Sequence, residues 1–184
     1  AKGHDFPRVT LVGVISADVG LGVADFRAAE RTFQLLTQVA GRAGRGESPG
    51  EAIIQTIHPD HYSIRYACDQ AYEPFYAEEI RFRESMRYPP WLSLVCIVVR
   101  GRSQSRTMAD AAELAARLRE LNARFTVLGP APAPIARLRG QYRAQLFMKG
   151  RHRRAMREAL LGVLDQRADL KRRVIVDVDP LNML

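Results

Sequence analysis

Apolar and polar positions follow two different periods along the chain, and the changes of period divide it into elements. Residues 8–16, RVTLVGVIS, form an almost continuous apolar run, which is typical of a strand buried on both faces of a parallel sheet. Apolar residues then recur at steps of three and four over residues 25–43, which indicates an amphipathic helix with Asp25 as its N-cap. Residues 50–57 form a second apolar strand. The pattern therefore predicts a strand–helix–strand unit whose further strands come from preceding sequence or from another chain.

A second helical region and a clear boundary follow this unit. Residues 62–87 are amphipathic and predicted to be helical, and Pro74 is expected to break them into two helices. The sequence RYPPW at residues 87–91 ends the region, because two consecutive prolines cannot continue a helix. We therefore expect three parts: residues 1–61, a helical connector at 62–91, and a domain at 92–184.

The last part shows a new order of elements. Strands are predicted at residues 92–101, at 142–150 and at 173–179, together with a short strand before a proline-rich loop in the stretch 125–141. Helices are predicted at 105–121, with Ser105 as N-cap, and at 151–167. The order βαββαβ is that of the split ferredoxin-like arrangement. The predicted fold class is thus α/β followed by α+β.

Composition and charge narrow the classes of function. The chain has 184 residues, and none of its apolar runs approaches the ~20 residues of a membrane span. Its two cysteines lack metal-ligand spacing, and a disulfide between them is not expected in a chain of intracellular character. The net charge is +8, and residues 137–173 alone have a balance of +9. This concentration of positive charge predicts a localised surface for an anionic partner.

One short stretch, QVAGRAGRG at residues 38–46, has a composition that suits two interpretations. Arg42 and Arg45 lie three residues apart, so a last helical turn would place both on one face together with Gln38. Arginine forks bind phosphate oxygens, and flanking glycines let a ligand approach the backbone closely. The alternative is a helix C-terminus with a glycine stop and cations near the negative end of the dipole.

Several motifs together resemble a known family. QVAGRAGR resembles motif VI of superfamily-2 helicases, Q-x-x-G-R-x-G-R, and AKGHDFPRVTLV resembles their motif V. With YPPW and the terminal DVDP, the whole chain resembles the primosomal protein N′ (PriA) family of replication-restart helicases. The resemblance implies a partial RecA-like lobe followed by a ferredoxin-like C-terminal domain. It also implies that the chain begins within motif V of a longer protein, an ATP-dependent 3′-to-5′ DNA helicase that acts in fork restart and primosome assembly.

The resemblance also implies roles for single residues. Arg42 and Arg45 would face the γ-phosphate of ATP, with Gln38 beside them, and the arginines would stabilise charge during phosphoryl transfer. The residues implied in nucleotide binding and its coupling to DNA are Gly3, Asp5, Gly41 and Gly44. Lys2 and His4 would contact the DNA backbone, although a solvated loop residue is the other interpretation of His4.

Several features of the family are absent from these residues. The sequence contains no G-x-x-x-x-G-K-[ST] phosphate loop, no acidic Walker-B box and no paired Cys-x-x-Cys motifs. The resemblance therefore implies that ATP, Mg²⁺ and zinc are bound with the help of preceding sequence, and no cofactor is expected on this segment alone. We expect it to be inactive as an ATPase by itself, and its parent to work in the bacterial cytoplasm at the replication fork.

Two basic clusters are candidate interfaces. Arginine, glycine and an aromatic residue on a loop suit phosphate contact and base stacking, and the candidates for DNA binding are Arg137, Arg139, Tyr142 and Arg143. Five cations at the start of a helix oppose its dipole, which suggests a functional site; they are Lys149, Arg151, Arg153, Arg154 and Arg157. A solvated basic face is the alternative. The resemblance implies branched DNA, the acidic tail of single-stranded DNA-binding protein and other primosome proteins as partners.

Two further alternatives remain open from sequence. Asp177 and Asp179 could hold a metal, but without a third ligand we expect them to pair with arginines such as Arg143 or to cap the sheet, and no metal site is predicted. For function, the rivals to a restart helicase are a non-enzymatic nucleic-acid or protein-binding module and a different superfamily-2 translocase. A phosphate loop followed by zinc-type cysteine pairs in preceding sequence would favour the restart helicase.

Overall fold

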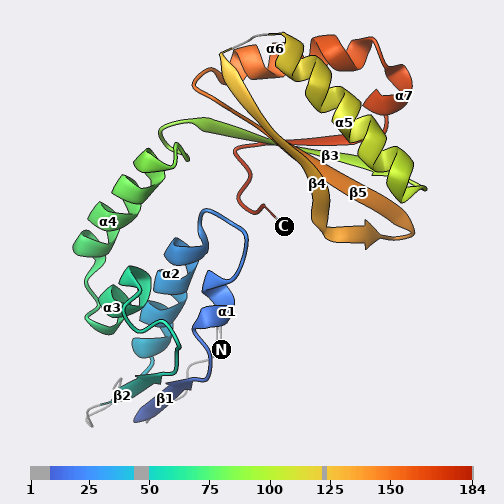
Figure 1. Cartoon of the computed structure of the whole chain (residues 1–184). Helices are drawn as coiled ribbons and strands as arrows, with labels where there is room; N and C mark the ends of the chain where they lie inside the picture. The colour runs from blue at the N-terminus through green and yellow to red at the C-terminus, as the bar shows by residue number, and fades with distance from the viewer. Residues whose placement is uncertain (1–8, 44–49, 122–123, 184) are drawn as a thin grey trace. The chain divides into compact units, whose positions relative to one another are not determined.

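The structure is a computed structural model that describes residues 9–43, 50–121 and 124–183. The chain separates into two compact units, Ala1–Phe82 and Arg83–Leu184 (Figure 1). Most of the helical region expected to connect two domains groups with the first unit. Among the helices of the described ranges, none has the length and apolar character needed to cross a membrane.

The first unit contains a two-stranded parallel sheet with helices packed on it (Figure 1). Strand β1 pairs with β2, with Leu11 opposite Glu51 and Val14 opposite Ile54. The elements are β1 (Leu11–Val14), α1 (Asp18–Leu21), α2 (Ala28–Ala40), β2 (Glu51–Ile54), α3 (Tyr62–Cys68) and α4 (Tyr72–Ser85). The predicted strand–helix–strand order is confirmed, and the short helix α1 is an element that the pattern did not indicate.

The burial predicted for the first strand is wrong within the described residues. Leu11 is 57% exposed, and Ile15, just after β1, is 82% exposed. On β2, Ile53 is 54% exposed. The apolar run correctly indicated a strand, but within residues 9–43 and 50–82 this sheet has two strands, and these residues do not cover the side of the sheet away from the helices.

Aromatic stacking fills the small core of the first unit. The rings of Phe33 and Phe75 stack face to face with 4.0 Å between their centroids, and Leu36 and Ile64 are buried beside them. The helical region divides as expected, but the break lies at residues 69–71, where Gln70 adopts a φ of 52°. Pro74 lies in the first turn of α4, where a missing N–H group removes no helical hydrogen bond.

The predicted N-cap of α2 is also displaced. The helix begins at Ala28 with Arg27 as its cap residue, and no side chain caps it. Asp25 is buried before the helix instead, where its Oδ1 accepts a hydrogen bond from the Arg27 N–H at 3.0 Å. Its Oδ2 forms an ion pair with Arg31 at 2.9 Å. Asp25 therefore supports the start of the helix from outside its first turn.

The second unit is a four-stranded antiparallel sheet in the order β4-β5-β3-β6, with helices on one face (Figure 1). Its elements are β3 (Ser93–Gly101), α5 (Gln104–Glu120), β4 (Phe125–Leu138), β5 (Gln141–Gly150), α6 (Arg153–Asp165), α7 (Ala168–Lys171) and β6 (Val174–Val178). The predicted succession of strands and helices is present, with α7 as an addition. Strand β3 is central, and seven of its nine residues are buried.

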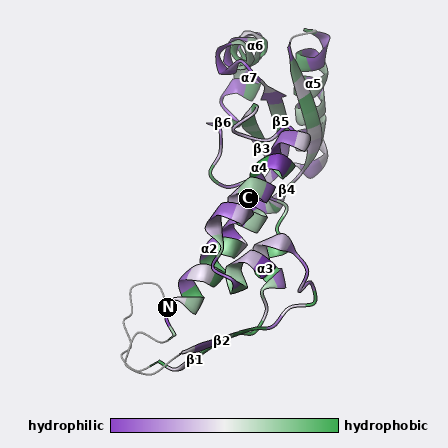
Figure 2. Ribbon diagram, turned by 90° about the vertical axis from the view of Figure 1, so that its left-hand side faces the viewer, coloured by the Kyte–Doolittle hydropathy of each residue, from purple (hydrophilic) through white to green (hydrophobic). Residues whose placement is uncertain are grey.

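The core of this unit lies between the sheet and the apolar faces of α5 and α6. Ile97 and Leu146 on the sheet and Leu118 on α5 are completely buried. The predicted inward residues of the last long helix are all buried: Met156, Leu160, Val163 and Leu164. Both kinds of residue, hydrophilic and hydrophobic, occur along these helices (Figure 2). The cap of α5 is Ser103, whose hydroxyl accepts a hydrogen bond from the Arg106 N–H, and not Ser105 as predicted.

The proline-rich segment differs most from its prediction. Residues 125–138 form one long strand, β4, that pairs with β5 on both sides of two register shifts. The shifts fall at Leu128/Ala131 and Pro132/Arg137, so Pro130 and Pro134 lie where the ladder is interrupted and need not donate to it, whereas Pro132 pairs in register with Ala144. Arg139 and Gly140 form the turn to β5, with φ angles of 49° and 77°, as a type I′ hairpin turn requires.

Candidate nucleotide and nucleic-acid sites

The first candidate site lies at the C-terminal end of α2. Gln38 is exposed on the last turn of the helix, and Gly41 is its C-cap with a φ of −67°. Arg42 is half-buried in the turn that follows, where its backbone N–H donates to the Val39 carbonyl at 3.0 Å. The helix therefore ends just before Gly41, and Arg42 lies beyond the regular helix on a tightened turn.

The remaining residues assigned to motifs V and VI lie outside the described residues. These are Lys2, Gly3, His4, Asp5, Gly44 and Arg45. Their roles, and the expected common face of Gln38, Arg42 and Arg45, stay predictions.

Asp18 joins the first helix to the end of β2, a contact that sequence reasoning missed. Thr56 donates its hydroxyl hydrogen to Asp18 Oδ1 at 2.6 Å, and the Ile57 N–H donates to Oδ2 at 3.1 Å. The Thr56 hydrogen bond is the main cause that lowers the pKa of Asp18. Both carboxylate oxygens are thus engaged by residues 38 and 39 positions later in the chain. Nothing in the local sequence pattern indicates a contact over that distance. The two hydrogen bonds to Asp18 hold the loop after β2 against α1.

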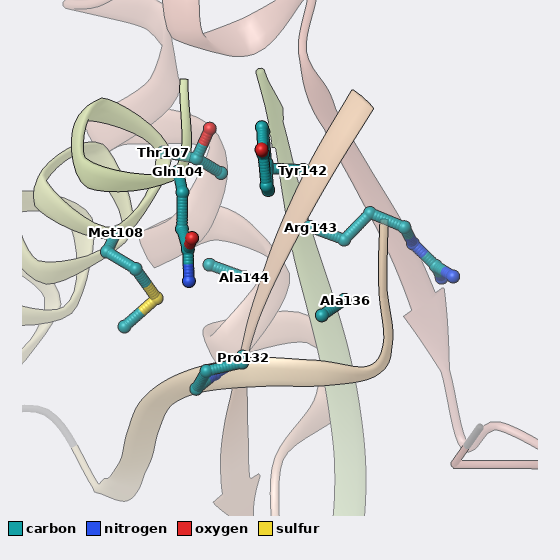
Figure 3. Close-up of a pocket in the computed structure, with 8 residues that line it drawn as sticks. All are labelled: Gln104, Thr107, Met108, Pro132, Ala136, Tyr142, Arg143 and Ala144. Carbon is teal, nitrogen blue, oxygen red and sulfur yellow. The ribbon is translucent and has the colours of Figure 1, made fainter. Parts of the chain in front are cut away.

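The candidate DNA-binding residues occupy the β4–β5 hairpin. The guanidinium of Arg137 lies 5.2 Å from the ring centroid of Tyr142, its register partner on β5. Tyr142 lies on the side of the strand that faces the start of α5, near Gln104 and Thr107, whereas Arg143 extends away from them (Figure 3). Successive residues of a strand point to opposite faces, so the side chains of Tyr142 and Arg143 extend in different directions, although both residues line the same small hollow.

Arg143 has an arginine directly opposite. It pairs in register with Arg100 on β3, and the Arg143 guanidinium donates a long hydrogen bond to the Ile135 carbonyl at 3.5 Å. Like charges on directly opposite residues destabilise a sheet. The Nε of Arg100 is buried and has no hydrogen-bond partner within the part of the chain that the structure describes. This end of the sheet therefore concentrates positive charge at a cost in stability.

Sequence reasoning missed three arginines at the same end of the sheet. Arg100 is the last residue but one of β3, Arg102 lies in the following loop, and Arg106 is in the first turn of α5. The signal was visible in VVRGRSQSR at residues 98–106, but the count of charge over residues 137–173 did not include it. The antiparallel register brings Gly101 opposite Tyr142 and so joins the two stretches.

The second basic cluster lies where β5 ends and α6 begins. Arg153 Nε pairs with Asp179 Oδ2 at 2.8 Å and donates to the Ser93 hydroxyl at 2.9 Å. Asp179 also accepts from the Leu94 N–H through Oδ1 at 2.9 Å. Arg153 is thus partly committed to holding the end of β6 on β3. The expectation that Asp179 pairs with an arginine or caps the sheet holds, but the arginine is Arg153 and not Arg143.

The other cations of this cluster differ in their contacts with neighbouring residues. Lys149 donates to the Met86 carbonyl at 2.9 Å and lies 3.9 Å from the centroid of the Tyr88 ring; burial is the main cause that lowers its pKa. Arg154 pairs with Glu158 at 2.7 Å on the helix surface. Arg151 and Arg157 are exposed. Four of the five cations of the cluster are therefore exposed to solvent, and Lys149 is half-buried.

The two basic clusters lie at opposite ends of β5. The hairpin turn precedes Gln141, and the other cluster begins at Lys149, next to the last residue of the strand. At about 3.3 Å per residue, these ends are ~30 Å apart. The positive charge of residues 137–157 therefore forms two separate surfaces.

Two further arginines of the basic region, Arg167 and Arg173, are engaged by acids of α5 and α7. Arg167 pairs with Glu113 and Asp169, and Arg173 pairs with Asp110 at 2.8 Å. Hydrogen bonding from Arg167 is the main cause that lowers the pKa of Asp169 to about 2. Asp110 and Glu113 lie outside residues 137–173, so the local balance of +9 overstates the free charge at this place.

Asp177 lies opposite Cys96 on the neighbouring strand. Burial, and then the charge of Asp177, raise the pKa of the Cys96 thiol to about 11. Both cysteines are free thiols. Within the described ranges, no group of three or more histidine, cysteine, aspartate or glutamate residues is arranged to hold a metal ion.

Comparison with known proteins identifies a family to which the chain is similar. A family model described as the Primosomal protein N C-terminal domain matches residues 84–181. The Replication restart protein PriA of Bacillus subtilis (strain 168) is 42% identical over 182 residues, which cover 97% of this chain and 23% of that protein. That of Treponema pallidum (strain Nichols) is 41% identical over 187 residues, covering 100% and 28%.

A third relative agrees with these two. The Replication restart protein PriA of Synechocystis sp. (strain ATCC 27184 / PCC 6803 / Kazusa) is 46% identical over 151 residues, covering 80% of this chain and 18% of that protein. The chain thus spans less than a third of the length of these three relatives. Among solved structures, the de novo designed protein Foldit4 has a TM-score of 0.37 at 10% identity and covers 47% of this chain and 92% of its own, a similarity too low to assign a shared fold.

Proposed function

The chain belongs to the primosomal protein N family, and we propose that it is the C-terminal part of an ATP-dependent DNA helicase that restarts replication forks. The observation that supports this is identity of about 40% that runs across both units, with relatives named replication restart proteins. In this proposal the first unit is the last segment of a RecA-like lobe, and the second is a ferredoxin-like domain. The strand order β4-β5-β3-β6, with both long helices on one face of the sheet, supports the ferredoxin-like assignment of the second unit.

The proposed role of the first unit is to supply arginines to an ATP site. Gln38 and Arg42 lie at the end of α2, and Arg45 follows on the segment QVAGRAGR. An arginine supplied from one lobe to a nucleotide held by another stabilises the charge of the transferred phosphoryl group. The phosphate loop, the Mg²⁺ ligands and the zinc site would come from preceding sequence. The parent would act in the bacterial cytoplasm.

The test is DNA-stimulated ATP hydrolysis by the full-length protein that contains this sequence. Arg45→Ala should reduce the rate by ~10³-fold or more, and Arg42→Ala should also reduce it strongly. Arg65→Ala is a matched control, because this arginine is 54% exposed on α3 of the same unit and its ion pair with Glu78 is long, at 3.7 Å. Near-normal hydrolysis in the Arg45 variant would remove the proposed role.

The proposed role of the second unit is to bind two anionic partners. Branched DNA is assigned to the hairpin cluster, and the acidic tail of single-stranded DNA-binding protein to the cluster at the start of α6, beside other primosome proteins. The ~30 Å between the clusters supports two ligands over one. By itself the chain would then be a binding module without ATPase activity, which is the second candidate function.

Salt titration separates these ligands. DNA binding through phosphates should weaken with a slope of ~0.9 in log affinity against log salt for each phosphate neutralised on duplex. Arg137→Glu with Arg139→Glu should weaken DNA, and Arg151→Glu with Arg157→Glu should weaken the acidic peptide. Arg153 is unsuitable for reversal, because a glutamate there would face Asp179. If neither pair weakens either ligand, the two clusters are solvated faces.

A further inference from the structure

An open pocket lies beside the first turn of α5, at the hairpin end of the sheet. Its volume is about 400 Å³, and it is lined by Gly101, Arg102, Ser103, Arg106, Thr107, Asp169 and Arg173. Three of the seven lining residues are arginines, from the loop after β3, from α5 and from the segment before β6. The antiparallel sheet brings these distant segments together, so no single stretch of sequence encodes the pocket.

Some charged side chains of this pocket have ion-pair partners, and others have none among the described residues. Arg173 is held by Asp110 at 2.8 Å and by the Arg100 carbonyl at 3.2 Å. Asp169 receives hydrogen bonds from Arg167 at both carboxylate oxygens, so its charge is compensated. Arg102 and Arg106 are exposed and make no ion pair within the part of the chain described here. Two arginine forks are therefore left for an anion from solution.

The local backbone keeps these arginines in place. Thr107 donates its hydroxyl hydrogen to the Ser103 carbonyl at 2.7 Å, and the Ser103 hydroxyl caps the Arg106 N–H. Gly101 lies so close to Thr107 that a Cβ atom would overlap its hydroxyl oxygen. The strand end and the helix start thus meet without an intervening side chain. The start of a helix also favours negative charge, because the positive end of the helix dipole lies there.

The pocket adjoins the hairpin cluster. Thr107 lines it and also lines the second hollow, on the other side of the helix start, that contains Tyr142 (Figure 3). Gly101 is the register partner of Tyr142, and Arg137 is the partner of Tyr142 on the other strand. The first turn of α5 is therefore flanked by Arg137 and Tyr142 on one side and by Arg102 and Arg106 on the other.

We propose that this pocket is a phosphate-binding subsite for nucleic acid, and that one nucleic-acid strand crosses the first turn of α5 between the hairpin and Arg102 and Arg106. The inference rests on the proposed DNA binding by the hairpin and extends that site to Arg102 and Arg106. The arginines bind the phosphate backbone, so the subsite recognises no particular base sequence. It contributes affinity and orientation to strand binding.

The test is binding of a fluorescently labelled 15-nucleotide oligo(dT) to the full 184-residue chain at several salt concentrations. Arg102→Gln with Arg106→Gln removes two charges that would each neutralise a phosphate of the single strand. The slope of log affinity against log salt should therefore fall by ~1.4, which is ~25-fold in affinity at 0.1 M salt. Arg81→Gln with Arg124→Gln removes the same charge from exposed positions outside the pocket and should have little effect.

Additional variants separate this inference from the function on which it rests. If Arg137→Gln with Arg139→Gln weakens binding and the Arg102/Arg106 pair does not, the subsite is overturned while DNA binding by the hairpin stands. If neither pair matters, both ideas fail. If the Arg102/Arg106 pair weakens only an acidic peptide of ten residues, the pocket belongs to a protein partner and the inference is overturned.

A measurement on the unaltered chain tests the subsite without relying on variants, which could misfold. Titration with the same oligonucleotide should shift the backbone amide resonances of Gln104, Ser105 and Arg106, which lie in the first turn of α5. Arg102→Lys with Arg106→Lys should retain most of the salt slope, because the charges remain. Unmoved amide resonances at saturating oligonucleotide would exclude the subsite.

Discussion

The two units differ in how completely each buries its own apolar side chains. In the second unit, helices cover the sheet, and Ile97, Leu118 and Leu146 have no exposed surface. In the first unit the paired strands leave Leu11 and Ile53 more than half exposed, and its core is a small cluster around Phe33 and Phe75. The same kind of apolar strand is thus a core element in one unit and an uncovered surface in the other.

This difference shows that hydrophobic content does not by itself make a core. A strand becomes buried only where other elements cover its faces, and burial stabilises by about 25 cal/mol for each Å² removed from water. The second unit has a central strand with a neighbour on each side. The described residues of the first unit form one pair of strands, and we expect their stability to come mainly from the helices packed around one aromatic stack.

The largest effect is expected from the aromatic stack. Phe33→Ala should destabilise the first unit by about 3–5 kcal/mol, which is comparable to the whole stability of a small domain. Amide hydrogen exchange should then become fast throughout α2 and α3. The single tryptophan, Trp91, belongs to the second unit, so the denaturant transition of its fluorescence should not move. A shifted Trp91 transition would show that the units do not unfold independently.

A slightly smaller effect is expected in the second unit. Leu146→Ala should lower the free energy of unfolding by about 2–5 kcal/mol, measured from the Trp91 transition in urea. Leu128→Ala is the matched control, because Leu128 lies on the neighbouring strand and is 42% exposed. That change should cost about 1 kcal/mol or less. Equal losses in the two variants would contradict the described burial.

Two glycines, Gly20 in the first unit and Gly101 in the second, test the comparison of the units further. A Cβ at Gly20 would lie 2.5 Å from the Thr32 hydroxyl oxygen, and one at Gly101 would overlap that of Thr107. The Thr107 hydroxyl is held by the Ser103 carbonyl, whereas that of Thr32 has no partner among the described residues. Gly101→Ala should therefore cost about 1–3 kcal/mol.

The first-unit glycine should respond differently. Gly20→Ala should be near neutral, because Thr32 can rotate without losing a hydrogen bond and alanine favours the helix by about 1 kcal/mol. Urea denaturation followed by circular dichroism measures both changes. In a Thr107→Ala background the penalty at Gly101 should fall, and an unchanged penalty there would show that its cause is not this contact.

The smallest effect is a pH dependence. Hydrogen bonding from Arg167 lowers the pKa of Asp169 from its ordinary value of 3.8 to about 2. A carboxyl group with a lowered folded pKa stabilises the fold above its unfolded pKa, and this contribution is lost as pH falls from about 4 to 2. The Trp91 midpoint in urea should fall over that range. Asp169→Asn should flatten this dependence; an unaltered profile would assign it to other carboxyl groups.

Local sequence determined most of the elements and the inward faces of the long helices. The steps of three and four that place Met156, Leu160 and Leu164 on one side of α6 depend only on helix geometry, so they could be read before any fold was known. The cap of α5 was misplaced by two residues, and the proline-rich part of β4 was predicted as a loop after a short strand. The cap was decided between two nearby serines by local hydrogen bonds from Arg106 and Thr107 to Ser103. For β4, tertiary pairing decided the outcome: β5 supplied a partner on which residues 125–138 extend around their prolines.

Tertiary structure alone decided burial, charge pairing and the composition of the sites. Whether residues 11–14 lie in a core depends on how many strands pair with them, which an apolar run cannot specify. The charge count over residues 137–173 predicted one localised basic surface, but an extended strand separates the two basic clusters in it by ~30 Å. The antiparallel register instead brings Arg100 beside Arg143 and Gly101 beside Tyr142, because pairing distances across a sheet bear no relation to separation along the chain.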